Sequence, residues 1–498
     1  MNKTYFKLPY FLQFFVVNAF GLSIRFKRYN KAFAKALDEY IQLDRVENCK
    51  LNIDKIIEVT KDSKFYSINN EQDFFGSPIL DKAAVKKYYD KIINHKYVYN
   101  YFHTSGTTGS GLKFPVSKDF LARQWAIFWK FRRIHNISTT TWCAYMIGKN
   151  ILDPDRRNPP YWIKSYPTYQ LLFSVSHLNK ETIEQYLTKI KESKIYWMHG
   201  YPSTLTYIAS LIKEAKLESL AKELNLKIIT TSSETLYDFQ KRNVEQIFGC
   251  CVRQLYGLTE GVANIFECEH GSLHIDESFS YVEFVREENS CEDYKIIGST
   301  YLNKAFPLIR YDTGDTVKLF EENYKCPCGR KSRVVKEIIG REQDYLILFD
   351  GTKVGGSGFF FKKLVHVNRA QIYQRRKGEA IFFLVKAPGF TEEEEQLLVE
   401  EITNKLGKNF KYEIRYTNDL IKLKNGKTKF VINEIETGCN LSNNQFLSNN
   451  IKKEKQEPNS DITNGNVWKE GIQVLALFLF KYIIFFSIHL ERFLNSSV

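Results

Sequence analysis

The chain has 498 residues and a formal net charge of +14, with 43% hydrophobic and 26% charged residues. This length predicts two or three domains, and this composition excludes a chain that is disordered over most of its length. The positive charge favours anionic partners such as nucleotides or acidic lipids. The sequence has no dense run of Lys and Arg and no signature of a nucleic-acid-binding module, so nucleic acid is not expected as a partner.

The first 100 residues are predicted to be mostly helical, with apolar periodicity over 31–43 and 80–95. Residues 8–30 are strongly apolar but are interrupted by Gln13 and Asn18, and no small-residue cleavage site follows them. We therefore interpret this segment as a structural amphipathic helix rather than a signal peptide.

Residues 101–340 alternate short apolar runs with helical patterns, which predicts α/β layering. Two of these runs, "IYWMHGY" (195–201) and "LKIITTSSE" (226–234), are typical of buried strands that end in polar loops. Ligand-binding loops in α/β folds lie at such strand ends.

A change of pattern near residue 345 predicts a small α+β module. It contains a hairpin with an Asp-Gly turn (344–354), a second hairpin (371–387) and a helix that begins after Thr391. We predict four segments: an N-terminal domain over 1–343, a small C-terminal lid domain over 344–436, an Asn- and Ser-rich linker over 437–466 and an apolar C-terminal helix over 467–498.

The apolar C-terminal segment is long enough to cross a bilayer. Residues 471–490 would span about 30 Å as a helix, and Lys481 is the one Lys, Arg, Asp or Glu among them. A charge near the middle argues against a simple span. Crossing a bilayer, lying in its interface and packing on a partner all remain open.

The stretch "TSGTTGSGLK" (104–113) has the composition of a phosphate-binding loop, but it is not a Walker A motif. Leu112 stands where that motif needs Lys, and Phe114 stands where it needs Ser or Thr. A nucleotide would therefore be held in another way.

Five further motifs follow in order: "TSSETL" (231–236), "YGLTEG" (256–261), "RYDTGD" (310–315), "GREQD" (340–344) and "LKNGKTKFV" (423–431). Each is weak alone. Together and in this order the six motifs resemble the adenylate-forming ligases, in the branch of phenylacetate–coenzyme A ligase and the CapK-type capsule-biosynthesis proteins. The resemblance runs from the N-terminus to about residue 436, and it implies a large α/β adenylate-forming domain of layered sheets and helices with a small mobile α+β domain after it.

The resemblance implies an ATP-dependent, AMP-forming ligase that uses Mg²⁺. Such an enzyme activates a carboxylic acid as an acyl-adenylate and transfers the acyl group to coenzyme A, or to an amino or hydroxyl group in capsular polysaccharide biosynthesis. The alternative is a catalytically inactive, membrane-associated component of a polysaccharide assembly system that keeps the fold. A cytoplasmic protein is expected, associated with the inner face of the cytoplasmic membrane through its C-terminal helix.

The same resemblance assigns roles around the phosphates of ATP. Hydroxyls and flexible glycine backbone suit a phosphate cradle, and Lys113 would add positive charge. Lys427 corresponds to a catalytic lysine carried by the small domain, and Asp344 to the hinge, where Gln343 replaces a second acid that is often present. The cradle consists of Thr104, Ser105, Gly106, Thr107, Thr108 and Gly109.

The remaining assignments concern the nucleoside and the metal. Glu260 would bind Mg²⁺, a cation that prefers oxygen ligands. Asp315 would accept hydrogen bonds from both ribose hydroxyls, and Thr259 would lie near the α-phosphate. The other residues expected to line the nucleotide pocket are Ser232, Ser233, Glu234, Tyr256, Gly257 and Arg341.

A structural zinc site is a separate hypothesis. Cys268 and His274 lie six positions apart, and Cys326 and Cys328 form a C-x-C pair. Thiolates with imidazole suit tetrahedral Zn²⁺, and His270 is an alternative to His274. Reduced structural thiols remain the other interpretation.

The segment "HGYPSTL" (199–205) resembles the acceptor-pocket segment of the family. His199, Tyr201 and Trp197 would flank an acyl group, or they would pack in the core as aromatic residues commonly do.

Overall fold

The computed structural model describes residues 3–44, 50–103, 113–146, 151–286, 293–320, 324–341, 346–351, 353–354, 360–361, 364, 366–387, 389–421 and 430–437. All of them belong to one compact unit, Met1–Asn440, and a second unit covers Leu441–Val498. The apolar segment 471–490 lies outside the described residues, and the predicted domain boundaries stay predictions. Within the described ranges, no helix is both long and apolar enough to cross a bilayer.

The N-terminal region is helical, as predicted. Helix α3 (Lys31–Leu43) matches the predicted range, and the Asn30 side chain caps it by accepting a hydrogen bond from the Phe33 N–H at 3.1 Å. The predicted segment 80–95 is divided between two short helices, α6 and α7, and a 3₁₀ turn. The elements before the first strand are α1 (Lys3–Phe6), α2 (Tyr10–Arg28), α4 (Ile53–Thr60), α5 (Glu71–Gly76), α6 (Lys82–Lys87), α7 (Tyr89–Ile92) and η1 (His95–Tyr97).

Helix α2 differs from an ordinary surface helix, whose exposed side is polar. Its buried side contains Gln13, whose side-chain amide donates to the Tyr5 and Phe6 carbonyls, and Gly21. A Cβ at Gly21 would lie 2.8 Å from the Ser165 hydroxyl, so the backbone approaches its neighbour closely here. The rest of the α2 surface exposes large apolar side chains: Phe11, Phe15, Val16, Phe20, Leu22 and Phe26.

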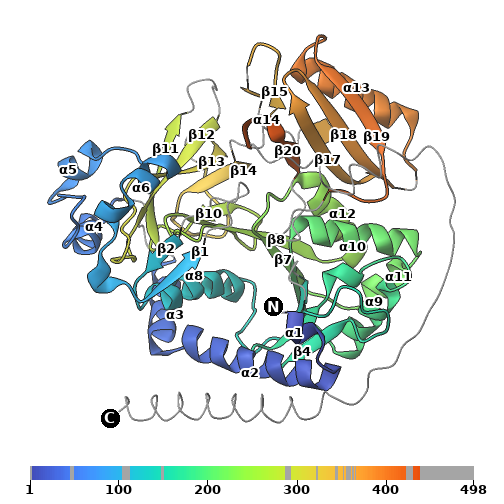
Figure 1. Cartoon of the computed structure of the whole chain (residues 1–498), viewed down its shortest axis with the longest axis horizontal. Coiled ribbons are helices and arrows are strands. Elements are labelled where there is room, and N and C mark those ends of the chain that lie inside the picture. The colour runs from blue at the N-terminus through green and yellow to red at the C-terminus, as the bar shows by residue number, and fades with distance from the viewer. Residues whose placement is uncertain are drawn as a thin grey trace. The chain divides into compact units, whose positions relative to one another are not determined.

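The main body is a sheet of twelve strands in the order β11-β12-β13-β14-β10-β9-β8-β7-β6-β3-β5-β4 (Figure 1). Strands β8, β7, β6, β3 and β5 pair in parallel, and the other neighbours pair antiparallel. The sheet contains β3 (Cys143–Met146), β4 (Trp162–Ser165), β5 (Gln170–Phe173), β6 (Trp197–Gly200), β7 (Ile228–Ser232), β8 (Cys251–Gly257), β9 (Asn264–Glu267), β10 (Leu273–Ile275), β11 (Ser280–Arg286), β12 (Asp293–Thr300), β13 (Tyr311–Leu319) and β14 (Val334–Arg341). This arrangement confirms the α/β prediction, including the buried strands β6 and β7.

Helices connect and cover the parallel strands. Helix α10 begins with Pro202 at its first turn, a position that favours helix initiation. A large apolar core packs α9, α10 and α12 against the parallel strands. The helices are α8 (Phe120–Ile134), α9 (Ile183–Glu192), α10 (Pro202–Glu214), α11 (Glu218–Glu223) and α12 (Asp238–Phe248), with the turn η2 (Val175–His177) and the hairpin β1 (Asn100–His103) and β2 (Lys113–Val116) beside them.

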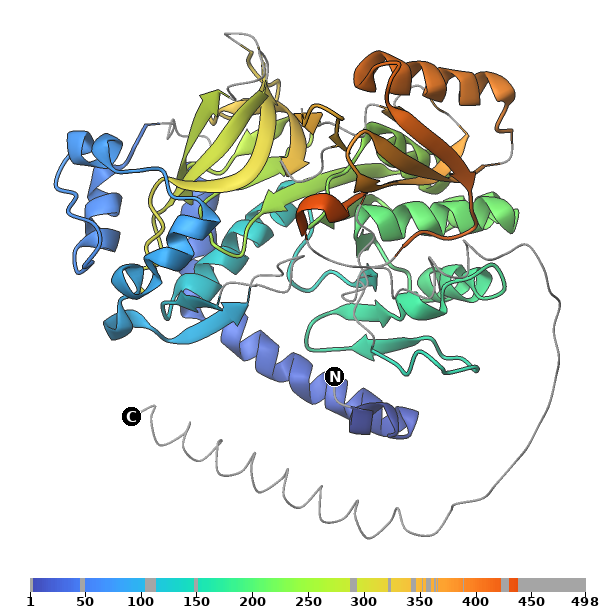
Figure 2. The ribbon, with the colours of Figure 1, turned by 45° about the horizontal axis from the view of Figure 1, so that its top comes forward.

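The C-terminal part confirms the predicted small α+β fold. A four-stranded sheet has the order β19-β18-β17-β20, and the predicted helix is present with Thr391 accepting a hydrogen bond from the Glu394 N–H. Both predicted hairpins are present, and Figures 1 and 2 show this sheet with its helix in orange. The elements are β15 (Leu346–Ile347), β16 (Lys353–Val354), β17 (Val367–Arg376), β18 (Glu379–Lys386), α13 (Glu392–Leu406), β19 (Lys411–Tyr416), β20 (Val431–Asn433) and α14 (Glu434–Thr437).

A buried ion-pair network fixes α8 on the sheet. The Lys130 ammonium lies 2.7 Å from an Asp44 oxygen and 2.5 Å from an Asp276 oxygen, and Lys130 and Asp276 are both almost fully buried. Burial raises the pKa of Asp276 to about 6, although the charge of Lys130 opposes that rise. Arg330 holds the second oxygen of Asp44 at 2.5 Å. Helix α8 is therefore tied to the end of α3, to the loop after β10 and to the segment that carries Cys326 and Cys328.

Candidate active site

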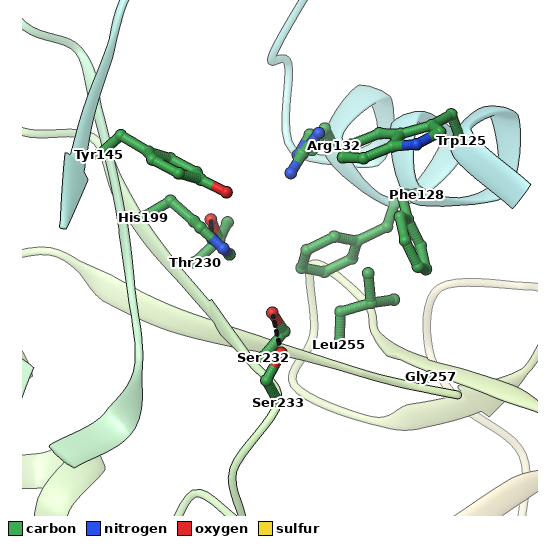
Figure 3. A pocket seen from close by; sticks show the side chains of 11 residues that line it. Trp125, Phe128, Arg132, Tyr145, His199, Thr230, Ser232, Ser233, Leu255 and Gly257 are labelled. Carbon is green, nitrogen blue, oxygen red and sulfur yellow. Dashed lines mark hydrogen bonds between the residues drawn. The ribbon is translucent and has the colours of Figure 1, made fainter. Parts of the chain in front are cut away.

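A pocket of about 190 Å³ lies between α8 and one face of the parallel strands. Helix α8 contributes Trp125, Phe128, Phe131 and Arg132 to its wall. The strands and the loop after β7 contribute Tyr145, His199, Thr230, Ser232, Ser233, Leu255 and Gly257. Figure 3 shows these two groups facing each other across the open space.

The periodicities of helix and strand explain why these residues meet. On α8, Trp125, Phe128 and Arg132 are spaced i, i+3, i+7 and so lie on one side of the helix. On the sheet, Tyr145 of β3, His199 of β6 and Thr230 of β7 are direct neighbours in the parallel register. Neighbouring residues in a sheet point to the same face, so these three side chains form one wall.

His199 is a neutral member of this wall. Its Nδ1 lies 2.9 Å from the Thr230 hydroxyl, and its ring stacks on Tyr145 with ring centroids 5.4 Å apart. Burial, with a further contribution from the nearby Arg132 charge, lowers the pKa of His199 to about 3. His199 therefore contributes a polar surface but no charge at neutral pH.

The expected nucleotide residues gather at the carboxyl ends of β7 and β8. Ser232 ends β7, and Ser233 and Glu234 follow it directly. A Glu234 carboxylate oxygen accepts a hydrogen bond from the Ser203 N–H at 3.0 Å, which joins this loop to the first turn of α10. Helix starts and strand ends of this kind supply the oriented donors that phosphate groups need.

Tyr256 and Asp315 lie together, although 59 positions separate them. The Tyr256 hydroxyl donates a hydrogen bond to an Asp315 carboxylate oxygen at 2.7 Å. In strand β8, Leu255 and Gly257 face the pocket beneath α8, so Tyr256 points to the opposite face. Strand β8 thus separates the pocket from the Tyr256–Asp315 pair.

Gly340, in strand β14, brings a further motif to the Tyr256–Asp315 pair. Asp315 of β13 pairs with Arg341 of β14 in the antiparallel register. Gly340 has φ of +99°, and a Cβ there would lie 2.6 Å from the Thr235 hydroxyl oxygen. Four of the six sequence motifs, those containing Thr235, Tyr256, Asp315 and Gly340, therefore meet at one place.

Other predicted residues are placed less closely or lie outside the described residues. Thr259 and Glu260 are half-buried in the turn after β8. Lys113 begins β2, and its ammonium lies 4.1 Å from the centre of the Tyr101 ring. The predicted roles of these residues stay predictions, as do those of Arg341 and the remaining pocket residues. Outside the described residues lie Thr104, Ser105, Gly106, Thr107, Thr108, Gly109, Gln343, Asp344 and Lys427.

The sequence analysis missed the contribution of α8 to the pocket. Trp125, Phe128 and Arg132 belong to no recognised motif. Their i, i+3, i+7 spacing was a usable signal, because three large side chains on one side of a helix predict a packed or ligand-facing surface. Of the suggested acyl-flanking residues, His199 lines the pocket. Trp197 does not line it but lies on the same face of β6, and its indole nitrogen donates a hydrogen bond to Thr230 at 2.7 Å.

A second cluster unites the four predicted metal ligands. Cys268, His274, Cys326 and Cys328 are all buried, and their ligand atoms lie within 4.8 Å of one another. The Cys268 and Cys326 sulfurs are 3.6 Å apart, and His274 Nε2 lies 3.3 Å from the Cys328 sulfur. The other ring nitrogen of His274 lies 3.0 Å from the Ser332 hydroxyl, which orients the ring. Three thiolates with one imidazole at such distances fit a tetrahedral zinc site, and His274 rather than His270 belongs to the cluster.

The buried, neutral His199 predicts a pH dependence of stability. Its folded pKa of about 3 lies below the ordinary value of 6.5, so the folded state binds fewer protons and loses stability as the pH falls through 6.5 towards 3. Between pH 7 and pH 5 this group costs about 2 kcal/mol. We expect His199→Asn to lose about that much less of its free energy of unfolding over this interval than the wild type, measured by urea denaturation at both pH values. Equal losses in the two proteins would contradict the buried neutral imidazole.

Comparison with known proteins finds several that are similar to this chain in sequence. A family model described as the CapK C-terminal domain matches residues 350–434. Protein CapK of Staphylococcus aureus is 25% identical over 88% of this chain and its own full length. Phenylacetate-coenzyme A ligase of Thermus thermophilus is 29% identical over 29% of this chain and 34% of that protein.

The fold also matches a solved ligase. The crystal structure of 2-hydroxyisobutyryl-CoA ligase in its postadenylation state, in complex with R3-HIB-AMP, superposes with a TM-score of 0.55 at 16% identity, covering 83% of this chain and 91% of that one. At this identity the match establishes the fold. The chain is thus similar in sequence to CapK over most of its length and to phenylacetate-coenzyme A ligase over part of it, and it has the fold of an adenylate-forming CoA ligase.

Proposed function

We propose that this protein is an ATP-dependent, AMP-forming ligase that activates a carboxylic acid and passes the acyl group to an acceptor. The supporting observation is the position of strand β8 between two sites. One face of β8 borders the pocket under α8, and the other carries Tyr256, which is hydrogen-bonded to Asp315. An acid bound in the pocket would present its carboxylate at the end of β7 and β8, where the nucleotide residues gather.

Adenylation joins two anions. A carboxylate oxygen of the acid attacks the α-phosphorus of ATP, the bond from that phosphorus to the bridging oxygen breaks, and pyrophosphate leaves with the electron pair. The acceptor then attacks the acyl carbon, AMP leaves, and the acceptor gives up its proton. Repulsion between the two anions must be offset by fixed positive charge and oriented donors.

The chain offers residues for each part of this task. Asp315 would accept hydrogen bonds from the ribose hydroxyls, and Glu260 would hold Mg²⁺ through its oxygens. The loop Thr104–Gly109 would hold the β- and γ-phosphates, with Thr259 near the α-phosphate. Lys113, Arg341 and Lys427 would supply the positive charge, Lys427 from the small domain.

Our proposal for the acceptor is based on how much of the chain each relative matches. Protein CapK matches over 88% of the chain, whereas phenylacetate-coenzyme A ligase matches over 29%. We therefore favour an amino or hydroxyl group of a capsular polysaccharide precursor as acceptor, with coenzyme A as the alternative. A cytoplasmic location at the membrane would suit this acceptor.

The first test is exchange of labelled pyrophosphate into ATP with a panel of carboxylic acids. Acid-dependent exchange is expected for the full chain. No exchange with any acid, together with no thermal shift on addition of ATP, would instead favour an inactive component that keeps the fold.

Asp315→Asn tests the ribose role. The change removes a charge that two hydroxyl donors would share, so we expect the KM for ATP to rise about 10-fold to 100-fold while the KM for the acid changes little. Asp312→Asn is the matched control, because its side chain accepts a hydrogen bond from the Gly314 N–H and an amide oxygen can keep that bond. Equal effects of the two variants would argue against the assignment.

We further propose that Cys268, His274, Cys326 and Cys328 bind a structural Zn²⁺. The four buried ligand atoms support this proposal, and a metal would join β9 and β10 to the 326–330 segment. Purified protein should contain about one zinc per chain, and Cys326→Ser should lose most of it and lower the melting temperature. Cys251→Ser, a half-buried cysteine outside the cluster, is the control. Less than about half an equivalent of zinc, with a harmless Cys326→Ser, would instead indicate reduced structural thiols.

A further inference from the structure

Arg132 is a buried cation that faces the pocket without an anionic partner in the described part of the chain. It is 9% exposed, and its guanidinium is surrounded by the rings of Trp129, Trp197 and Trp125 at 4.6, 5.0 and 6.0 Å. Among the described residues, no carboxylate lies within ion-pair distance of it. Buried charges in proteins are ordinarily paired, so an unpaired guanidinium that borders a cavity calls for a partner from the ligand.

The surroundings of Arg132 are positive. Arg28 lies 3.9 Å from the centre of the same Trp125 ring, and burial, together with the charge of Arg132, lowers the pKa of Arg28. His199, the other titratable nitrogen group on the pocket wall, is neutral at neutral pH. The indole rings hold the guanidinium in place by cation–π contacts but cannot neutralise it.

Figure 3 shows how the pocket is arranged around this charge. The Arg132 guanidinium faces the space between Trp125 and Tyr145, on the far side of the pocket from Ser232 and Ser233. The walls between these ends include Phe128, Phe131 and Leu255. The pocket thus has a polar end near the nucleotide residues and a cationic far end, and between them it has one apolar wall and one wall formed by Tyr145, His199 and Thr230. Its volume of about 190 Å³ is below that of pockets for drug-sized ligands.

We infer that the acid substrate is a small dicarboxylate with an apolar body. One carboxylate would react at the Ser232 end while the other pairs with Arg132. This inference rests on the proposed function, because it assigns the reacting carboxylate to the nucleotide end of the pocket. Arg132 acts as a specificity residue: an acid with only one carboxylate leaves its guanidinium unpaired, and this loss of pairing is what discriminates.

Binding of matched acids to the full chain without ATP tests the inference. The probes are glutarate against pentanoate and terephthalate against 4-methylbenzoate, followed by the fluorescence of the tryptophans around Arg132. Each dicarboxylate is expected to bind at least about tenfold more tightly than its partner. Arg132→Met should abolish this preference, and Arg132→Lys, which keeps the charge, should retain part of it.

Two results would overturn the inference: monocarboxylates that bind the wild type as well as dicarboxylates do, or a preference that survives in Arg132→Met. Circular dichroism of both variants shows whether they are folded. Pyrophosphate exchange with the same acids separates the inference from the proposed function. A binding preference without exchange would refute the function alone, and exchange that favours monocarboxylates would refute the inference alone.

The exposed side of helix α2 carries a second, independent inference. Phe11, Phe15 and Phe26 are 59%, 64% and 68% exposed and, with Leu22, lie along one side of the helix, which Figure 2 shows in blue along the edge of the molecule. A row of exposed apolar side chains of this kind marks an interaction site. We call this surface, made of Phe11, Phe15, Leu22 and Phe26, the α2 face.

Charge identifies the partner. Residues 1–37 contain seven Lys or Arg and no Asp or Glu, which is half of the net charge of the chain. Arg25 and Arg28 contact the protein itself, whereas Lys7, Lys27, Lys31 and Lys35 are exposed. Outward aromatic and aliphatic side chains with exposed lysines nearby suit the interface of a membrane that contains anionic lipid. We propose that the α2 face docks on such a membrane, with its aromatic rings at headgroup depth.

Photo-crosslinking of the full chain identifies the occupant directly. Phe15→p-benzoylphenylalanine should yield a lipid adduct, identified by mass, on vesicles of phosphatidylcholine with phosphatidylglycerol. The same change at Phe75, which is 47% exposed on α5, should not. Phe15→Ser with Phe26→Ser should weaken vesicle binding about tenfold, and salt should weaken it further. Adducts at position 15 to residues 467–498 of the chain or to a second copy, in place of lipid, would overturn the proposal.

Discussion

The pairing register of strand β8 is the constraint on which both halves of the site depend. Because side chains alternate along a strand, Leu255 and Gly257 border the pocket while Tyr256 reaches Asp315 on the other face. A slip of one residue against β7 would exchange these faces and send the tyrosine into the pocket. The register is fixed on both sides, since β8 pairs in parallel with β7 and antiparallel with β9.

Helix α8 forms the wall of the pocket that faces β8. Phe131 and Leu255 border the pocket, and both also belong to the apolar cluster around Cys268, Cys326 and Cys328. The proposed zinc site therefore lies directly behind the pocket wall. A metal that joins these cysteines would stiffen that wall without contacting a substrate, as structural zinc does in small domains.

Much of the fold could be predicted from the sequence. Strong local signals identified helix α3, strands β6 and β7, the two C-terminal hairpins and the Thr391-capped helix, because periodicity and capping are properties of neighbouring residues. The ordered motifs indicated a resemblance to the adenylate-forming ligases and placed both Tyr256 and Asp315 among the expected nucleotide-binding residues. The place of Arg132 on the pocket wall could not be predicted, because it depends on which side of α8 faces the sheet. The orientation of α2 could not be predicted either. Gln13 and Asn18 suggest a solvent-exposed side, but their side-chain amides donate hydrogen bonds to backbone carbonyls of the protein.

Two cations of α8, Lys130 and Arg132, lie two positions apart but have different surroundings. Lys130 forms ion pairs with Asp44 and Asp276, whereas Arg132, on the other side of the same helix, lines the pocket. A helix cannot rotate to adjust one without displacing the other. A change in what the pocket binds is therefore expected to come from the exchange of individual side chains, because movement of the helix backbone would break the ion pairs of Lys130.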